Sequence, residues 1–239
     1  MTECLTMPTS IDPASAEAEP VVRCGHRHLC ELRPRTASEQ RAAAFIRRRF
    51  EQAYGARPTL HMPPLMALVS EHGTLLAAVG VRNAAVERLF LEDYLDRPIE
   101  ACLPCAGAER ASVVEIAHLA GVETGISRPL FAALAVRLNQ RGLTWVVCTG
   151  TAQLRNSFQH LGIDVVDLGG ADPDRLAGAG QTWGRYYECQ PRVLAINVRQ
   201  GLESLRARGL LRHVQSIDAS ATMVTSAAWA TGGGYGHTG

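Results

Sequence analysis

The sequence predicts an α/β (α+β) fold in which a mixed central sheet is covered by flanking helices. Two observations predict it. First, two apolar runs at 65–70 and 74–81 are separated only by Glu-His-Gly, which favours an antiparallel hairpin. Second, strand-like and helix-like segments alternate from residue 112 onward, which predicts a β-α-β unit with a parallel strand pair. The sheet should therefore be antiparallel in its first half and partly parallel in its second.

The first half of the domain begins with an amphipathic helix at 36–54. Thr36 can cap it, Phe45, Ile46 and Phe50 recur at helical spacing, and Gly55 can end it. The hairpin follows. Residues 90–103 carry apolar side chains at helical offsets interrupted by Pro98, so we expect two short helices or one broken helix there.

The second half begins with a strand expected at 112–120, which takes in nearly all of the segment VVEIAHLAG at 113–121. A helix at 127–141 is predicted by the Leu130, Leu134 and Leu138 stripe, with Pro129 in its first turn and Gly142 after its last. The elements expected after it are a strand at 144–149, a helix within 151–162 and a strand at 164–168.

Composition limits the class of protein. The chain of 239 residues is 46% hydrophobic and 20% charged, as in ordinary globular proteins, and its net charge of +1 gives no reason to expect a nucleic-acid partner. We expect a flexible N-terminal tail at 1–30, a single domain at 31–215 and a flexible Gly-rich C-terminal tail at 216–239. With no secretory signal or apolar run long enough to span a membrane, we expect a cytoplasmic protein; its oligomeric state stays open.

Several segments resemble the thermostable hemolysin family, in the same order along the chain. They are FIRRRFEQAYGA, GTLLAAVGVRNA, LFLEDYLDRPIE, VVEIAHLAG, LFAALAVRLNQRGLTWVVCTGTAQLRNSFQHLGI and WGRYYECQPRV, and together they cover roughly residues 35–200. The element order is also similar to that of GNAT acyltransferases and, more distantly, acyl-homoserine lactone synthases. The resemblance implies a GNAT-like sheet whose central strand is bulged and splayed to admit an acyl thioester.

Glu115 and His118 are two titratable residues within an otherwise apolar strand. Side chains three residues apart point to opposite faces of a regular strand, but a β-bulge between them would bring both to one face. Glu115 would then accept the proton of an attacking amine, with His118 assisting. The alternative is that Glu115 is a structural carboxylate paired with a buried Arg and His118 a core histidine. Acyl-homoserine lactone synthases have Arg where this chain has His118, so the similarity supports acyl transfer rather than lactone synthesis.

A donor phosphopantetheine arm is expected beside the end of this strand. GNAT enzymes that use acyl-CoA bind pyrophosphate in a Gly-rich loop before a helix N-terminus, and here the segment GVETGISR retains part of that pattern. The resemblance implies donor contacts from Leu119, Ala120, Gly121, Gly125, Ser127, Arg128, Arg155 and Asn156. The alternative is an ordinary capped loop, with solvent-exposed polar residues on the later helix.

The segment Trp183-Gly-Arg-Tyr-Tyr187 is the densest aromatic patch. The resemblance implies that Tyr186 or Tyr187 protonates the departing thiolate; the alternative is an aromatic cluster at the sheet edge. No metal is expected, because the ligands of CGHRHLC are too crowded and CLPC is a lone C-x-x-C.

The predicted function is acyl transfer from acyl-CoA or acyl carrier protein to the amine of a small molecule. Two alternatives stay open: a membrane-active, hemolysin-type protein, and a GNAT-like binding module without catalysis.

Overall fold

The computed structural model describes residues 9–57, 62–105, 107–122, 125–176 and 180–217. One nine-stranded mixed sheet runs through the molecule in the order β7-β8-β6-β5-β4-β3-β2-β1-β9. The strands are β1 (Ala18–Cys24), β2 (Arg27–Leu32), β3 (Leu65–Ser70), β4 (Leu75–Asn83), β5 (Val113–Gly121), β6 (Trp145–Gly150), β7 (Val166–Gly170), β8 (Arg192–Asn197) and β9 (Val214–Ser216).

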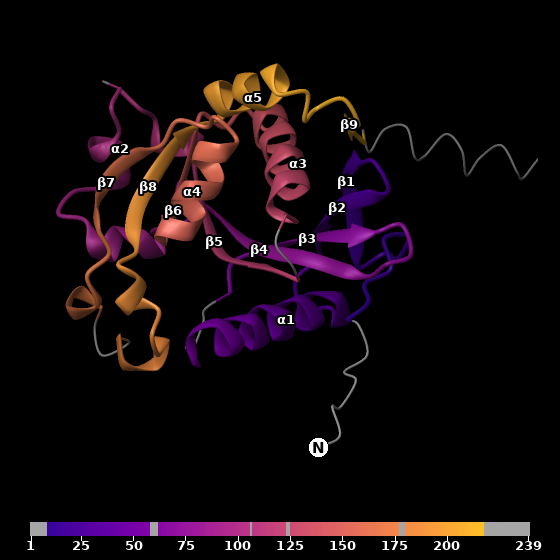
Figure 1. Ribbon diagram of the computed structural model, residues 1–239, viewed down its shortest axis with the longest axis horizontal. Coiled ribbons are helices and arrows are strands. Elements are labelled where there is room, and N and C mark those ends of the chain that lie inside the picture. Colours follow the sequence, from indigo (N-terminus) through magenta and orange to yellow (C-terminus); the bar gives the residue numbers. More distant parts are fainter. Residues whose placement is uncertain (1–8, 58–61, 106, 123–124, 177–179, 218–239) are drawn as a thin grey trace, which may run out of the picture.

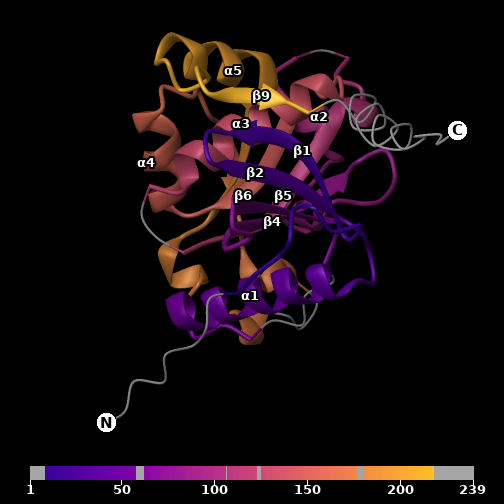
Figure 2. The same ribbon diagram turned by 90° about the vertical axis from the view of Figure 1, so that its right-hand side faces the viewer.

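Helices cover both faces of this sheet. They are α1 (Ala37–Tyr54), α2 (Ile99–Cys102), α3 (Ser127–Gln140), α4 (Ala152–His160) and α5 (Val198–Ala207), and the longer 3₁₀ turns are η1 (Phe90–Tyr94) and η4 (Gly180–Trp183). Helix α1 lies on one face, whereas α3, α4 and α5 lie on the other (Figures 1 and 2). The predicted mixed α/β fold with flanking helices is therefore confirmed.

Helix α1 forms for the reasons that the sequence indicated. The Thr36 hydroxyl accepts a hydrogen bond from the backbone N–H of Glu39, and Gly55 ends the helix in the left-handed conformation at φ 65°. Phe45, Ile46 and Phe50 are buried on the face toward the sheet. This packing fixes one wall of the central cavity described below.

Strand β5 carries the predicted bulge. Ala78 pairs with Ala120 and Gly80 with Ala117, so β5 has one residue more than β4 over this stretch. The extra residue is accommodated where His118 adopts φ 54°, a left-handed conformation that is uncommon for residues other than Gly. The expectation of a bulged central strand is therefore confirmed.

The same strand also separates from its other neighbour. Strands β5 and β6 pair in parallel only from Val113 to Glu115, opposite Trp145 to Val147. Beyond this point β6 continues beside β8 as far as Gly150 while β5 follows β4, so the two central strands diverge. This is the predicted splay.

The expectation of a tail at 1–30 is wrong for its second half. Strand β1 pairs with β2, which in turn pairs with β3, and Val22, Leu29 and Cys30 are fully buried. These apolar side chains, joined through a turn at Gly25 with φ 59°, bury enough surface to hold the segment in the sheet. The predicted C-terminal tail begins too early, because Ser216 lies in β9, which pairs with β1; residues 218–239 lie outside the described part.

Candidate active site

A cavity of about 560 Å³ lies where β5 and β6 separate. It is lined from both faces of the sheet, by α1 and the turn around Trp183 on one face and by α3, α4 and α5 on the other. Its volume falls within the range of about 300–1,000 Å³ that is usual for small-molecule sites. The cavity therefore joins two compartments through the central opening of the sheet.

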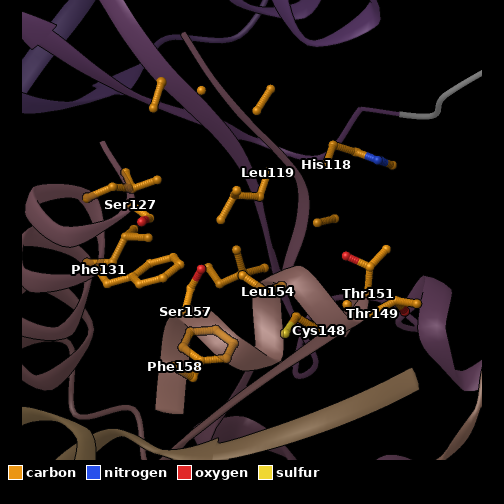
Figure 3. A pocket seen from close by; sticks show the side chains of 18 of the residues that line it. His118, Leu119, Ser127, Phe131, Cys148, Thr149, Thr151, Leu154, Ser157 and Phe158 are labelled. Atoms are coloured by element: carbon orange, nitrogen blue, oxygen red, sulfur yellow. The ribbon is translucent and has the colours of Figure 1, made fainter. Parts of the chain in front are cut away.

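The compartment on the α3, α4 and α5 face is aliphatic, and the part facing the opening also carries two phenyl rings. Phe131 and Phe158 lie with ring centroids 4.9 Å apart, and Figure 3 shows them beside Ser127, Leu154 and Ser157. The aliphatic lining residues are Leu130, Leu134, Leu138, Leu154, Ile163, Ile196, Val198 and Leu205. A surface of this kind suits a flexible hydrocarbon chain, which gains free energy when its methylene groups leave water.

The compartment on the α1 face is aromatic. Its rings come from three separate segments and include Phe50 and Tyr54 of α1, Phe90 of η1, and Trp183 and Tyr186. Trp183 lies 6.0 Å from Phe50 and 5.4 Å from Tyr186 between ring centroids, and Tyr54 meets Tyr186 edge to face at 5.2 Å. Flat, rigid walls of this kind favour a compact ligand over an extended chain.

His118 lies on the aromatic side of the opening. Its ring is 6.4 Å from that of Trp183 in a stacked arrangement and 6.3 Å from that of Phe50 in an edge-on one. Burial, reinforced by the positive charge of Arg82, lowers the pKa of His118 to about 4. The imidazole is therefore neutral at pH 7 and can accept a proton from a ligand.

Glu115 lines the same cavity, but its carboxylate is held by neighbouring donors. It accepts hydrogen bonds from the backbone N–H groups of Phe90 at 2.9 Å and Leu91 at 3.1 Å, and from Arg82 at 3.3 Å. The side chain is 2% exposed. Burial raises the pKa of Glu115, while the two N–H groups and Arg82 oppose that rise. The predicted alternative of a carboxylate paired with a buried Arg is thus present, and Glu115 also anchors η1 beside the aromatic compartment.

Thr149 is a site residue that the sequence interpretation missed. Its buried hydroxyl has no hydrogen-bond partner within the described part of the chain, and it lines the cavity two residues after β6 leaves β5 (Figure 3). Buried polar groups are nearly always hydrogen-bonded, so an unpaired one in a cavity is available to a ligand or a water molecule. The available signal was a hydroxyl at the end of the apolar run TWVVCT.

The two tyrosines with a predicted role are placed differently. Tyr186 lines the cavity, and its hydroxyl donates a long hydrogen bond of 3.4 Å to the carbonyl oxygen of Thr149. Tyr187 lies outside the described lining, and its hydroxyl shares a 2.6 Å hydrogen bond with the hydroxyl of Tyr94. Burial raises the pKa of Tyr186 above the ordinary value, so this hydroxyl keeps its proton. Tyr186 is therefore the one of the pair that can meet a ligand in the cavity.

The predicted donor-binding residues divide into two groups. Those that line the cavity are Leu119, Ala120, Gly121, Gly125 and Ser127. A Cβ at Gly121 would lie 2.6 Å from the Cγ2 atom of Ile126, so Gly is needed where the loop folds back on the strand.

The other group lies outside the described cavity lining. The side chains of Arg128 and Asn156 are exposed, and Arg155 lies 4.0 Å from Asp167 across an ion pair. Gln153 and Ser157 of α4 line the cavity instead. Donor contacts by Arg128, Arg155 and Asn156 stay predictions.

The chain was compared with known families and structures. The family model described as Thermostable hemolysin matches residues 32–202. The chain belongs to the thermostable hemolysin family. None of the curated proteins compared matches it by sequence. Among the described helices of this family member, none is both long and apolar enough to cross a membrane.

Solved structures share its fold at low sequence identity. TofI in a ternary complex with an inhibitor and MTA is 14% identical with a TM-score of 0.51, covering 76% of this chain and 96% of that one. FeeM, an N-acyl amino acid synthase from uncultured soil microbes, is 15% identical with a TM-score of 0.48, covering 72% and 92%. The AHL synthase LasI is 13% identical with a TM-score of 0.47, covering 76% and 91%. The likeness to TofI establishes a GNAT-like fold for this thermostable hemolysin family member.

Proposed function

We propose that the protein is an acyltransferase that moves an acyl group from a phosphopantetheine thioester to the amine of a small molecule. The donor is acyl-CoA or acyl carrier protein. The observation that carries the proposal is the cavity through the bulged and splayed centre of the sheet, which joins an aliphatic compartment to an aromatic one. Such a cavity accommodates two unlike reactants with their reacting ends at the opening.

The donor occupies the aliphatic compartment and the opening. Its acyl chain lies among the Leu and Ile side chains of α3, α5 and β8, and its pantetheine arm passes the first turns of α3 and α4. Ser127 and Thr151 lie at those turns and line the cavity, so they supply hydroxyl groups to the arm (Figure 3). The first backbone N–H groups of a helix also favour anionic or polar ligands.

The amine acceptor occupies the aromatic compartment beside His118. The amine nitrogen attacks the thioester carbonyl carbon; a C–N bond forms, and the C–S bond breaks as the thiolate leaves. Neutral His118 takes one proton from the nitrogen in the tetrahedral intermediate, where that nitrogen is acidic. The resulting imidazolium is a strong acid because of its low pKa, and it returns the proton to the thiolate sulfur. The products are an amide and a free thiol.

Two hydroxyl groups assist this step. The unpaired hydroxyl of Thr149 donates to the carbonyl oxygen as it gains negative charge. The hydroxyl of Tyr186 turns from the carbonyl oxygen of Thr149, 3.4 Å away, and donates its hydrogen bond to the departing sulfur. The raised pKa of Tyr186 makes it a poor source of the proton itself, so His118 takes over the role expected for the tyrosine. Glu115 acts as a positioning residue, because its carboxylate is occupied by three donors, namely two backbone N–H groups of η1 and Arg82 of β4.

The direct test is incubation of the purified protein with panels of acyl-CoA, acyl carrier proteins and small amines. Thiol release and an N-acylated product in the mass spectrum are expected. Thr149→Val should lower kcat by roughly 10²–10³, as loss of one oxyanion donor does. Thr144→Val, at the exposed residue just before the same strand, should leave kcat unchanged.

Three outcomes would contradict the proposal. Binding of thioesters without any turnover would favour a GNAT-like binding module. Leakage of liposomes at physiological salt without acyl transfer would favour membrane activity. Equal effects of Thr149→Val and Thr144→Val would remove Thr149 from the reacting centre.

A further inference from the structure

Helix α5 carries a glycine where it faces the cavity. Gly201 is buried, lines the cavity, and lies in the interior of the helix, which begins at the Asn197 cap. Gly is unfavourable in a helix interior relative to Ala, because it loses more backbone freedom on folding. A glycine at this place therefore has a structural cost that something else must offset.

Close packing of the protein does not explain this glycine. A Cβ at position 201 would lie 3.7 Å from the Cγ2 atom of Ile196 and 3.9 Å from the Cγ2 atom of Ile163, which are ordinary van der Waals distances. Apart from its chain neighbours and the backbone of its own helix, no other described residue has an atom within 4 Å of that position, so α3 does not approach closely enough to exclude a methyl group. Gly201 also needs no left-handed backbone, unlike the glycines with positive φ. The space beside Gly201 therefore belongs to the cavity and not to the packed core.

Gly201 lies at the end of the cavity opposite the acceptor compartment. Helices α1 and α5 occupy opposite ends of the molecule in both views (Figures 1 and 2), and the cavity has lining residues on each of them. Gly201, Ile163 and Leu205 form the aliphatic wall on the α5 side. A hydrocarbon chain that starts at a thioester in the central opening ends against this wall.

We propose that Gly201 determines the length of the acyl chain that the donor carries, and that the preferred donor has a straight aliphatic chain long enough to reach α5. This inference rests on the proposed acyltransferase function. The missing side chain leaves room for the terminal carbons of the chain, and Ile163 limits that room from the facing side. Branched or short acyl groups would leave the wall uncovered and lose the free energy that burial of methylene groups supplies.

The test measures kcat/KM for a series of straight-chain acyl donors, from butanoyl to hexadecanoyl, with wild type and three variants. Gly201→Ala adds one methyl group to the wall. It should lower kcat/KM for the longest accepted chain by roughly tenfold or more, leave the butanoyl donor unaffected, and move the optimum to a shorter chain. Ile163→Val keeps the Cγ2 methyl group but removes the δ1 carbon, so the wall loses the volume of one methylene; the optimum should move toward longer chains, by roughly fourfold in kcat/KM for each further buried methylene.

Gln200→Ala is the matched control, because Gln200 is the exposed neighbour of Gly201 on the same helix. It should reproduce the wild-type profile. Gly201→Ala should also unfold at a higher temperature than wild type, because Ala is the better helix former, so a loss of long-chain activity cannot be attributed to misfolding.

Failure of the two proposals can be told apart. If wild type transfers acyl groups but Gly201→Ala and Ile163→Val keep its chain-length profile, the role of Gly201 is refuted and the acyltransferase function stands. If both variants lower kcat/KM equally for every chain length, Gly201 is again refuted as the determinant. If wild type transfers no acyl group from any donor, the function fails and this inference with it.

Discussion

Replacement of Glu115 by Gln decides between the two roles that the sequence leaves open for this carboxylate. Gln can still accept one hydrogen bond through its oxygen, for example from the N–H of Leu91, but its NH₂ group would face the remaining donors from Phe90 and Arg82. Because Glu115 is 2% exposed, bulk solvent does not reach its carboxylate to supply the lost acceptor. Removal of one partner of a buried ion pair typically costs about 3–5 kcal/mol, and we expect a loss of this size in the free energy of unfolding.

The assay is urea denaturation followed by tryptophan fluorescence. With a slope of roughly 2–3 kcal/mol/M, the midpoint should fall by about 1–2 M. Glu87→Gln is the matched control: it removes the other carboxylate of Arg82, but Glu87 is 38% exposed and should contribute less than about 1 kcal/mol. A Glu115→Gln midpoint indistinguishable from wild type, combined with a large loss of kcat, would refute the structural role and restore Glu115 as the catalytic base.

Three further predictions concern buried titratable groups and the bulge. The pKa of His118 is about 4 in the folded protein and has its ordinary value of 6.5 in the unfolded chain, so protonation favours unfolding as pH falls through that window. The free energy of unfolding should drop by roughly 3 kcal/mol from pH 7 to 4. His118→Phe should make the free energy of unfolding from urea melts depend less on pH in this range. Arg110 lowers the pKa of Glu92 to about 2, so the stability that this buried carboxylate contributes is lost between pH 4.5 and 2. Arg110→Met should therefore make acid unfolding begin at a higher pH, as measured by circular dichroism. Since His118 has φ 54°, His118→Gly should be more stable than His118→Ala by about 1 kcal/mol, and equal stabilities would argue against the left-handed bulge.

Much of the fold could be predicted because its elements are encoded locally. The Thr36 cap and Gly55 stop mark α1, and the crossover helix α3 between β5 and β6 follows from the alternation of strand and helix periods. The bulge was expected from the resemblance to GNAT acyltransferases, because Glu115 and His118, three residues apart, share one face of the strand only if a residue is inserted.

The rest depended on contacts that are distant in the sequence. Strand β1 lies between β2 and β9, which comes from the far end of the chain, so local periodicity could not reveal that residues 18–32 belong to the sheet. Arg82, the partner of Glu115, lies 33 residues earlier, and nothing near it in the sequence marks it as buried. Nothing in the sequence distinguishes Thr149 from other strand residues. Its hydroxyl lies in the cavity because the pairing of β5 with β6 ends two residues earlier, which only the structure shows.

The surroundings of the polar side chains change at the point where β5 and β6 stop pairing. Glu115 is the last residue of β5 that pairs with β6, and its carboxylate is occupied by donors from β4 and η1. His118 and Thr149 lie just beyond the residues through which β5 and β6 pair with each other, and both line the cavity. The hydrogen bonds between β5 and β6 hold the edge of the opening rigidly. Polar groups become available to a ligand only beyond the last paired residues of these two strands. The two titratable residues of VVEIAHLAG therefore line one cavity in different surroundings, and under the proposed function the carboxylate fixes the geometry while the imidazole handles the proton.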